Sequence, residues 1–117
     1  MTARPNRPAH VSLEMIPMPE HEARRLMRAS QIVEWRGWCQ GQLEDRRGRV
    51  CAVRAYQLAA LESEKQFGGY GLLAVSLVLD TDLTVAQWND GNGRSLSEVV
   101  SAYRRTAHAL MEVARGN

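Results

Sequence analysis

The C-terminal segment of this chain repeats apolar side chains with the period of an α-helix, and this pattern constrains the fold more than any other feature. Ser95 and Glu98 have the spacing of a capping box, which binds the free amide groups at the start of a helix. The apolar positions that follow trace one face: Leu96, Val99, Val100, Tyr103, Ala107, Leu110 and Ala114. A helix with one apolar face has to pack that face against other elements.

A second amphipathic helix is predicted near the N-terminus, from Pro19 to Gly37. Proline suits the first helical position, acids such as Glu20 favour the first turn, and glycine commonly ends a helix. The packing face is expected to hold Leu26, Met27, Ser30 and Val33. The solvent face is expected to hold Arg24, Arg25, Arg28 and Gln31.

The middle of the chain predicts shorter elements. Small apolar residues indicate a helix over about 50–65, and Thr84 with Gln87 forms a capping box that opens a short helix ending at Trp88. Residues 72–79 fit a buried strand or a buried helix; the helix is favoured because no partner strand is evident. Residues 89–93 form a turn, and residues 11–16 fit a strand or a docked extended segment.

These elements predict an all-α fold, a compact bundle of four to five helices with long ordered connectors. Residues 1–18 contain three of the four prolines and are expected to form a flexible or extended N-terminal arm. Residues 19–117 are expected to form a single helical domain, which is an ordinary size for one hydrophobic core.

Composition indicates a cytoplasmic protein without a membrane segment. The longest apolar run, 72–79, is too short to cross a bilayer, and the basic N-terminus lacks the apolar stretch of a secretory signal. Two cysteines do not make a disulfide framework. The formal net charge of +2 is too small to indicate nucleic-acid binding by itself.

Four short motifs occur in order between residues 22 and 110. They are Trp38-Cys39-Gln40-Gly41, Gly48-Arg49-Val50-Cys51-Ala52, Trp88-Asn89-Asp90 and Gly93-Arg94-Ser95 followed by Glu98-Val99. The pattern resembles a family of small proteins of unknown function found in actinobacteria and their phages. The resemblance implies a host range, including a phage-related origin, and implies no activity.

The cysteines are the first candidates for chemistry. Cys39 and Cys51 could contribute to a zinc site with His21 or His108, but the spacing lacks paired ligands, so buried structural thiols are favoured. Cys39 could instead act as a nucleophile with His108 and Asp90 or Asn89. His108 falls on the polar face of its helix, so we expect no catalytic residue, no cofactor and no metal ligand.

Two surfaces are candidates for binding. The motif loops supply a partner or ligand surface: Trp38, Gln40, Trp88, Asn89, Asp90 and Arg94, with Asp90 and Arg94 expected to pair with each other. The helices supply basic faces for nucleic acid: Arg24, Arg28, Arg104, Arg105 and Arg115. Trp35 carries less information than the other two tryptophans.

The favoured function is a non-catalytic interaction or regulatory protein that binds another protein or a second copy of itself. It depends on the tryptophan-bearing loops and on the lack of a convincing catalytic or metal constellation. The alternatives are a DNA- or RNA-binding regulator that uses the basic helical faces, and a small enzyme with Cys39 as nucleophile.

Overall fold

The computed structural model describes residues 11–63 and 69–116, and within them the chain is helical, as predicted. The elements are a short 3-10 turn, η1 (Leu13–Met15), and the helices α1 (Pro19–Arg36), α2 (Ala52–Glu62), α3 (Tyr70–Leu79), α4 (Val85–Asn89) and α5 (Leu96–Gly116). β-Structure in this part of the chain is limited to isolated bridges of Val50 with Trp38 and Glu44. The all-α prediction is confirmed.

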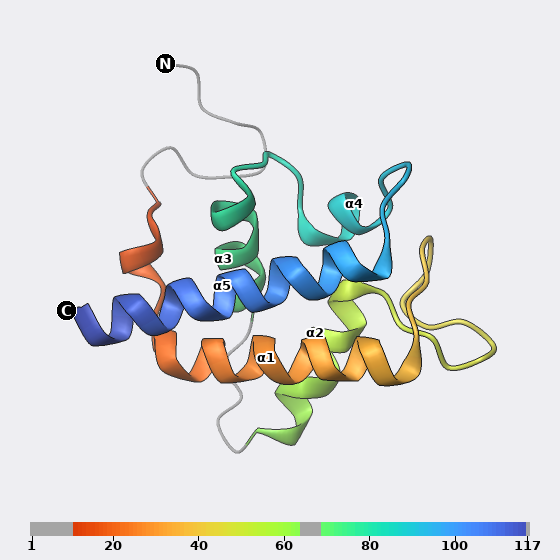
Figure 1. Cartoon of the computed structure of the whole chain (residues 1–117), viewed down its shortest axis with the longest axis horizontal. Coiled ribbons are helices and arrows are strands. Elements are labelled where there is room, and N and C mark those ends of the chain that lie inside the picture. The colour runs from red at the N-terminus through yellow and green to blue at the C-terminus, as the bar shows by residue number, and fades with distance from the viewer. Residues whose placement is uncertain (1–10, 64–68, 117) are drawn as a thin grey trace.

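The two longest helices, α1 and α5, run antiparallel along one face of the molecule, and α2, α3 and α4 lie behind them (Figure 1). The core fills the space between these two layers. Its largest fully buried apolar side chains are Leu26, Val33, Val50, Val75, Val99, Tyr103 and Leu110. The outer side of the α1–α5 pair therefore stays open to solvent along its length.

The apolar face predicted for α5 is buried, except at its C-terminal end. Ser95 Oγ accepts a hydrogen bond from the Glu98 amide at 3.3 Å, which caps the helix as its sequence indicates. Tyr103 is fully buried, and its hydroxyl donates to the carbonyl oxygen of Ala52 at the start of α2. Ala114 is exposed because the last turn of α5 extends beyond the core.

Helix α1 begins at Pro19 and ends before Gly37, as predicted, but two of its side chains lie on the other side from expectation. Gly37 adopts a φ of 91°, and its amide donates to the carbonyl oxygen of Val33. Met27, predicted to pack inward, is 41 % exposed. Arg25, predicted to face solvent, is 4 % exposed because a carboxylate and a phenol pack beside it.

The remaining elements mostly follow their sequence patterns. Residues 72–79 belong to a helix, and α4 has the capping box predicted from Thr84 and Gln87. Helix α2 starts later than predicted because the backbone of Val50 bonds to Gly37 and Cys39 instead. Its predicted end at residue 65 lies outside the described residues.

The segment 11–16 is not a strand. Leu13–Met15 forms a 3-10 turn, and Ile16 behind it is 3 % exposed and packs in the core. The rest of the predicted arm, residues 1–10, lies outside the described residues. No helix within 11–63 and 69–116 combines the length and apolar character that crossing a membrane requires.

A buried polar cluster joins α1, α2 and α3. The Tyr56 hydroxyl donates to Glu22 Oε1 at 2.6 Å, Arg25 donates to both at 3.3 Å, and the Gly71 amide donates to the Tyr56 hydroxyl at 3.4 Å. Burial and the hydrogen bond to Glu22 raise the pKa of Tyr56 to about 12, so this phenol stays a donor. Gly71 packs directly against this cluster, which leaves no room for a larger side chain at that position.

We predict that Gly71→Ala destabilises the protein. A Cβ at this position would lie 2.6 Å from Tyr56 Cε1 and 2.9 Å from Glu22 Oε1, and the hydrogen bonds hold both groups in place. Overpacking costs about 1–3 kcal/mol, which outweighs the gain of up to about 1 kcal/mol from replacing glycine within a helix. Urea denaturation measures the change in unfolding free energy.

The matched control is Gly116→Ala, because nothing lies within 4 Å of a Cβ built at that α5 glycine. It is expected to leave stability unchanged or slightly higher. A Gly71→Ala protein as stable as this control would contradict the packing described for the cluster.

Candidate functional site

The structure brings the motif segments together around the side chain of Asn89, which is fully buried at the end of α4. Its Oδ1 accepts from Trp38 Nε1 at 2.7 Å and from the Ala52 amide at 2.9 Å. Its Nδ2 donates to the Cys39 carbonyl oxygen and to Asp90 Oδ1, both at 3.1 Å. The amide thereby uses two acceptor and two donor positions, its full capacity.

Neighbouring residues extend this network on the surface. Gln40 Nε2 donates to the carbonyl oxygens of Asn89 at 3.0 Å and Gly91 at 2.9 Å. Asp90 Oδ1 accepts from the Gly41 amide at 3.0 Å, and this hydrogen bond, followed by that from Asn89, lowers the pKa of Asp90. The loop after α1 and the turn after α4 are thus bonded together at several points.

Arg94 completes the network without contacting Asp90. Its guanidinium lies over the Trp88 ring at 4.2 Å from the centroid, and its Nε donates to the Trp88 carbonyl oxygen at 2.9 Å. Its Nη1 pairs with Glu98 Oε2 at 3.0 Å. The expected pairing of Asp90 with Arg94 is therefore wrong, because each already has other partners.

The structure brings together all six residues of the candidate partner surface: Trp38, Gln40, Trp88, Asn89, Asp90 and Arg94. Their hydrogen bonds run to one another and to nearby backbone. Trp88 is 8 % exposed and Asn89 is fully buried. Trp38 and Arg94 are half-buried and Gln40 and Asp90 are exposed, but the polar groups of all four already bond within this network, which holds the connectors to the helices.

We predict that Asn89→Ala strongly lowers stability. The substitution removes partners from the Trp38 indole, the Ala52 amide and the Cys39 carbonyl oxygen, all at a buried position. An unsatisfied buried polar group costs about 1–3 kcal/mol, so a loss of about 2 kcal/mol or more in unfolding free energy is expected in urea denaturation. Asn92→Ala, an exposed neighbour in the same turn, is the control. Equal stabilities of the two variants would refute the role of Asn89.

Both cysteines are free thiols buried beside this network. Cys39 Sγ donates to the Arg49 carbonyl oxygen at 3.3 Å, and burial, with the nearby charge of Asp45, raises its pKa. Cys51 Sγ accepts from the Arg54 amide at 3.4 Å and so caps α2. A raised pKa disfavours the thiolate, which a cysteine nucleophile requires.

The other groups proposed for chemistry are dispersed. The His108 side chain is 77 % exposed on α5, whereas Cys39 lies in the connector after α1. Within the described ranges, no group of three or more histidine, cysteine, aspartate or glutamate side chains is placed to hold a metal ion.

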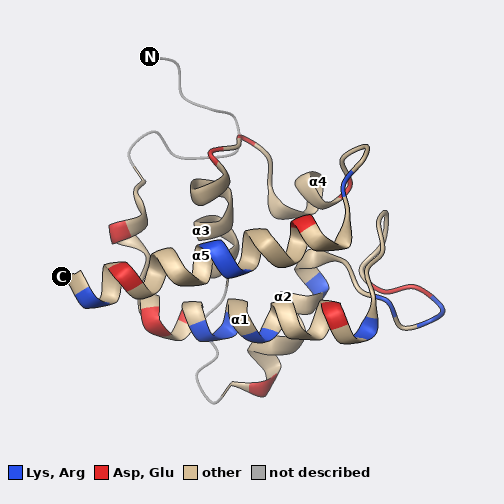
Figure 2. Ribbon diagram, viewed as in Figure 1, with Lys and Arg blue, Asp and Glu red and all other residues tan. Residues whose placement is uncertain are grey.

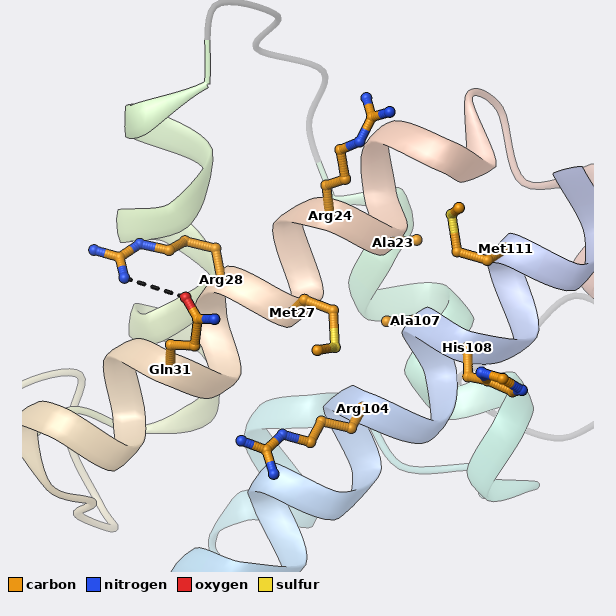
Figure 3. Close-up of a pocket in the computed structure, with 9 residues that line it drawn as sticks. All are labelled: Ala23, Arg24, Met27, Arg28, Gln31, Arg104, Ala107, His108 and Met111. Carbon is orange, nitrogen blue, oxygen red and sulfur yellow. Dashed lines mark hydrogen bonds between the residues drawn. The ribbon is translucent and has the colours of Figure 1, made fainter.

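A different site lies on the open side of the α1–α5 pair, where the two helices border a groove of about 590 Å³ (Figure 3). Met27 and Met111 extend into the space between the helices, and Ala23 and Ala107 lie beneath them. Polar side chains border it: Arg24, Arg28, Gln31, Arg104 and His108.

A second hollow of about 470 Å³ continues along the same two helices. It is lined by Glu34, Leu96, Ser97, Val100, Ser101, Arg104 and Arg105. Arg104 lines both hollows and pairs with Glu34 at 2.6 Å across the helices. We call the groove and this hollow together the α1–α5 seam.

Trp35 lies on the same exposed face of α1 and is 86 % exposed. It follows Met27 and Gln31 at intervals of four residues, so it occupies the same side of the helix one turn further along. Sequence analysis favoured the other two tryptophans and set this one aside. The helical phase could have found it, because Trp35 lies opposite Leu26 and Val33.

The structure places the predicted nucleic-acid residues unevenly. Arg24, Arg28, Arg104 and Arg105 line the seam, whereas Arg115 lies on the last turn of α5. Most of them pair with carboxylates: Arg24 with Glu20 at 2.6 Å, Arg28 with Glu62 at 2.7 Å, Arg104 with Glu34 at 2.6 Å and Arg115 with Glu112 at 2.9 Å. Figure 2 accordingly shows acidic and basic residues interspersed along α1 and α5.

These features define a class of small helical protein with loops fastened by a buried asparagine and an open seam between its two longest helices. The chain belongs to a family of unknown function, DUF6197, whose model matches residues 17–109. The resemblance to a family of unknown function is thereby confirmed. No curated protein and no solved structure shows a significant match to the chain.

Proposed function

We propose that this protein is a non-catalytic interaction protein that binds another protein through the α1–α5 seam. The observation that carries the proposal is the 41 % exposure of Met27 in the groove between the two longest helices; Trp35, outside the lining of the seam but on the same helix, is 86 % exposed. A large apolar side chain held in water on a rigid helix stabilises a complex when a partner covers it.

The composition of the seam supports a protein as its ligand. Tryptophan, methionine and arginine are enriched at protein interfaces, and tryptophan and arginine dominate their binding energy. The seam combines Met27 and Met111 with arginines at its border, and Trp35 is exposed on α1 outside its lining. The motif loops contribute indirectly, because they fix the end of α1 beside which Trp35 lies.

Binding of nucleic acid is less well supported. A nucleic acid binds chiefly through its phosphates, so it would leave the apolar floor with Met27 and Met111 uncovered. An enzyme that uses Cys39 is also less well supported, since the raised pKa of that thiol opposes its activation. We place the protein in the cytoplasm, where thiols such as Cys39 and Cys51 stay reduced.

Site-specific photo-crosslinking tests the proposal. A benzophenone amino acid replaces Gln31 in the seam or, as a matched control, Gln57, an exposed glutamine on α2. In cells that naturally express the protein, we expect a discrete protein adduct from position 31 and none from position 57. Adding Met27→Glu is expected to abolish the adduct, because it puts a charge on the apolar floor.

Two results would contradict the proposal. One is the absence of any protein adduct from position 31. The other is the same set of adducts from positions 31 and 57, because that pattern reports random encounters and not a binding surface.

A further inference from the structure

We propose that the α1–α5 seam binds one amphipathic α-helix of a partner, whose apolar stripe is bordered by aspartate or glutamate residues. This inference rests on the proposed function and specifies the chemistry of the partner. It is argued from the shape of the seam, its floor and the charge of its border.

The shape of the seam suits a helix. Its lining residues come from two antiparallel helices at helical spacing, Ala23 to Glu34 on α1 and Leu96 to Met111 on α5. The stretch on α5 corresponds to roughly 22 Å at about 1.5 Å per residue, which matches a partner helix of about 15 residues. A third helix laid along two others packs its ridges into the groove between them.

The floor of the seam suits an apolar stripe. The small side chains of Ala23 and Ala107 leave the hollow, and the flexible thioethers of Met27 and Met111 extend over it (Figure 3). Methionine adapts its shape to the side chains that it meets. Leu96 and Val100 continue the apolar floor into the second hollow.

The border of the seam favours an acidic partner. The lining of the groove includes Arg24, Arg28 and Arg104 but no carboxylate; the second hollow adds Arg105 and one carboxylate, Glu34, which pairs with Arg104. The ion pairs that these arginines make are half exposed, such as Arg28 with Glu62 at 48 % and 50 %. Exposed pairs contribute only about 0–1 kcal/mol, so exchange for a partner's carboxylate costs little.

The border and the floor of the seam disfavour two other occupants, a second copy of this chain and a nucleic acid. A second copy placed symmetrically on the seam would bring arginines to face arginines. A nucleic acid would leave the methionine floor without an apolar contact. An acidic amphipathic helix uses both the floor and the border.

Two designed helical peptides test this inference with the full-length protein. Both are 18 residues long and carry the same leucine and methionine stripe at helical spacing; glutamates border the stripe in one and lysines in the other. Fluorescence anisotropy measures binding of each labelled peptide. We expect the glutamate peptide to bind the wild type about tenfold more tightly than the lysine peptide, a difference of about 1.4 kcal/mol.

Variants assign the binding to the seam. Met27→Glu is expected to weaken binding of the glutamate peptide at least about tenfold, and Arg105→Glu to remove its advantage over the lysine peptide. Arg47→Glu, which makes the same charge change in the loop between α1 and α2, is the control and is expected to change neither. Far-ultraviolet circular dichroism of each variant verifies its helical fold.

Equal binding of the two peptides, no binding of the glutamate peptide at millimolar concentration, or equal effects of Arg105→Glu and Arg47→Glu would overturn the inference. A crosslinked adduct between two copies of this chain at position 31 would overturn it as well. If position 31 crosslinks another protein while the peptide test fails, the proposed function stands and only the acidic helix is wrong.

Discussion

The structure depends on one buried amide. Asn89 has its full set of hydrogen bonds, and they reach the first connector, the start of α2 and the turn before α5. A long connector between helices has backbone groups that water or protein must satisfy, and these contacts satisfy them where the connector meets the core. Because α1 ends at that connector and α5 begins after that turn, Asn89 joins the segment that follows α1 to the segment that precedes α5.

The motifs and the open face of the molecule consequently have different roles. The motif side chains are occupied with one another, down to the stacking of Arg94 on Trp88. The outer face of α1, in contrast, exposes the apolar side chains of Met27, which lines the seam, and of Trp35, which lies outside it. The short motifs of this chain thus hold its connectors to its helices. The surface proposed to bind a partner protein lies elsewhere, between α1 and α5.

Sequence patterns were enough for the fold class and for most helix positions, because helix periods and caps are local signals, as for α5 and α4. They were not enough for Arg25, whose burial depends on Glu22 and on Tyr56 from another helix. The motif residues were recognised as a group, but their hydrogen bonds link positions about 50 residues apart, which no local pattern reveals. The α1–α5 seam needed the relative placement of two distant helices, although the exposure of Trp35 followed from its phase in α1.

The hydrogen bonds of Asn89 hold the Trp38 indole in place, whereas the Trp35 indole lies in solvent. Hydrogen exchange of the tryptophan indole N–H groups measures this difference. With the three indole signals assigned by nuclear magnetic resonance, the Trp38 N–H, bonded to Asn89, should exchange only when the structure opens, and the Trp35 N–H should exchange at the rate of a free indole. Equally fast exchange at both tryptophans would contradict the account.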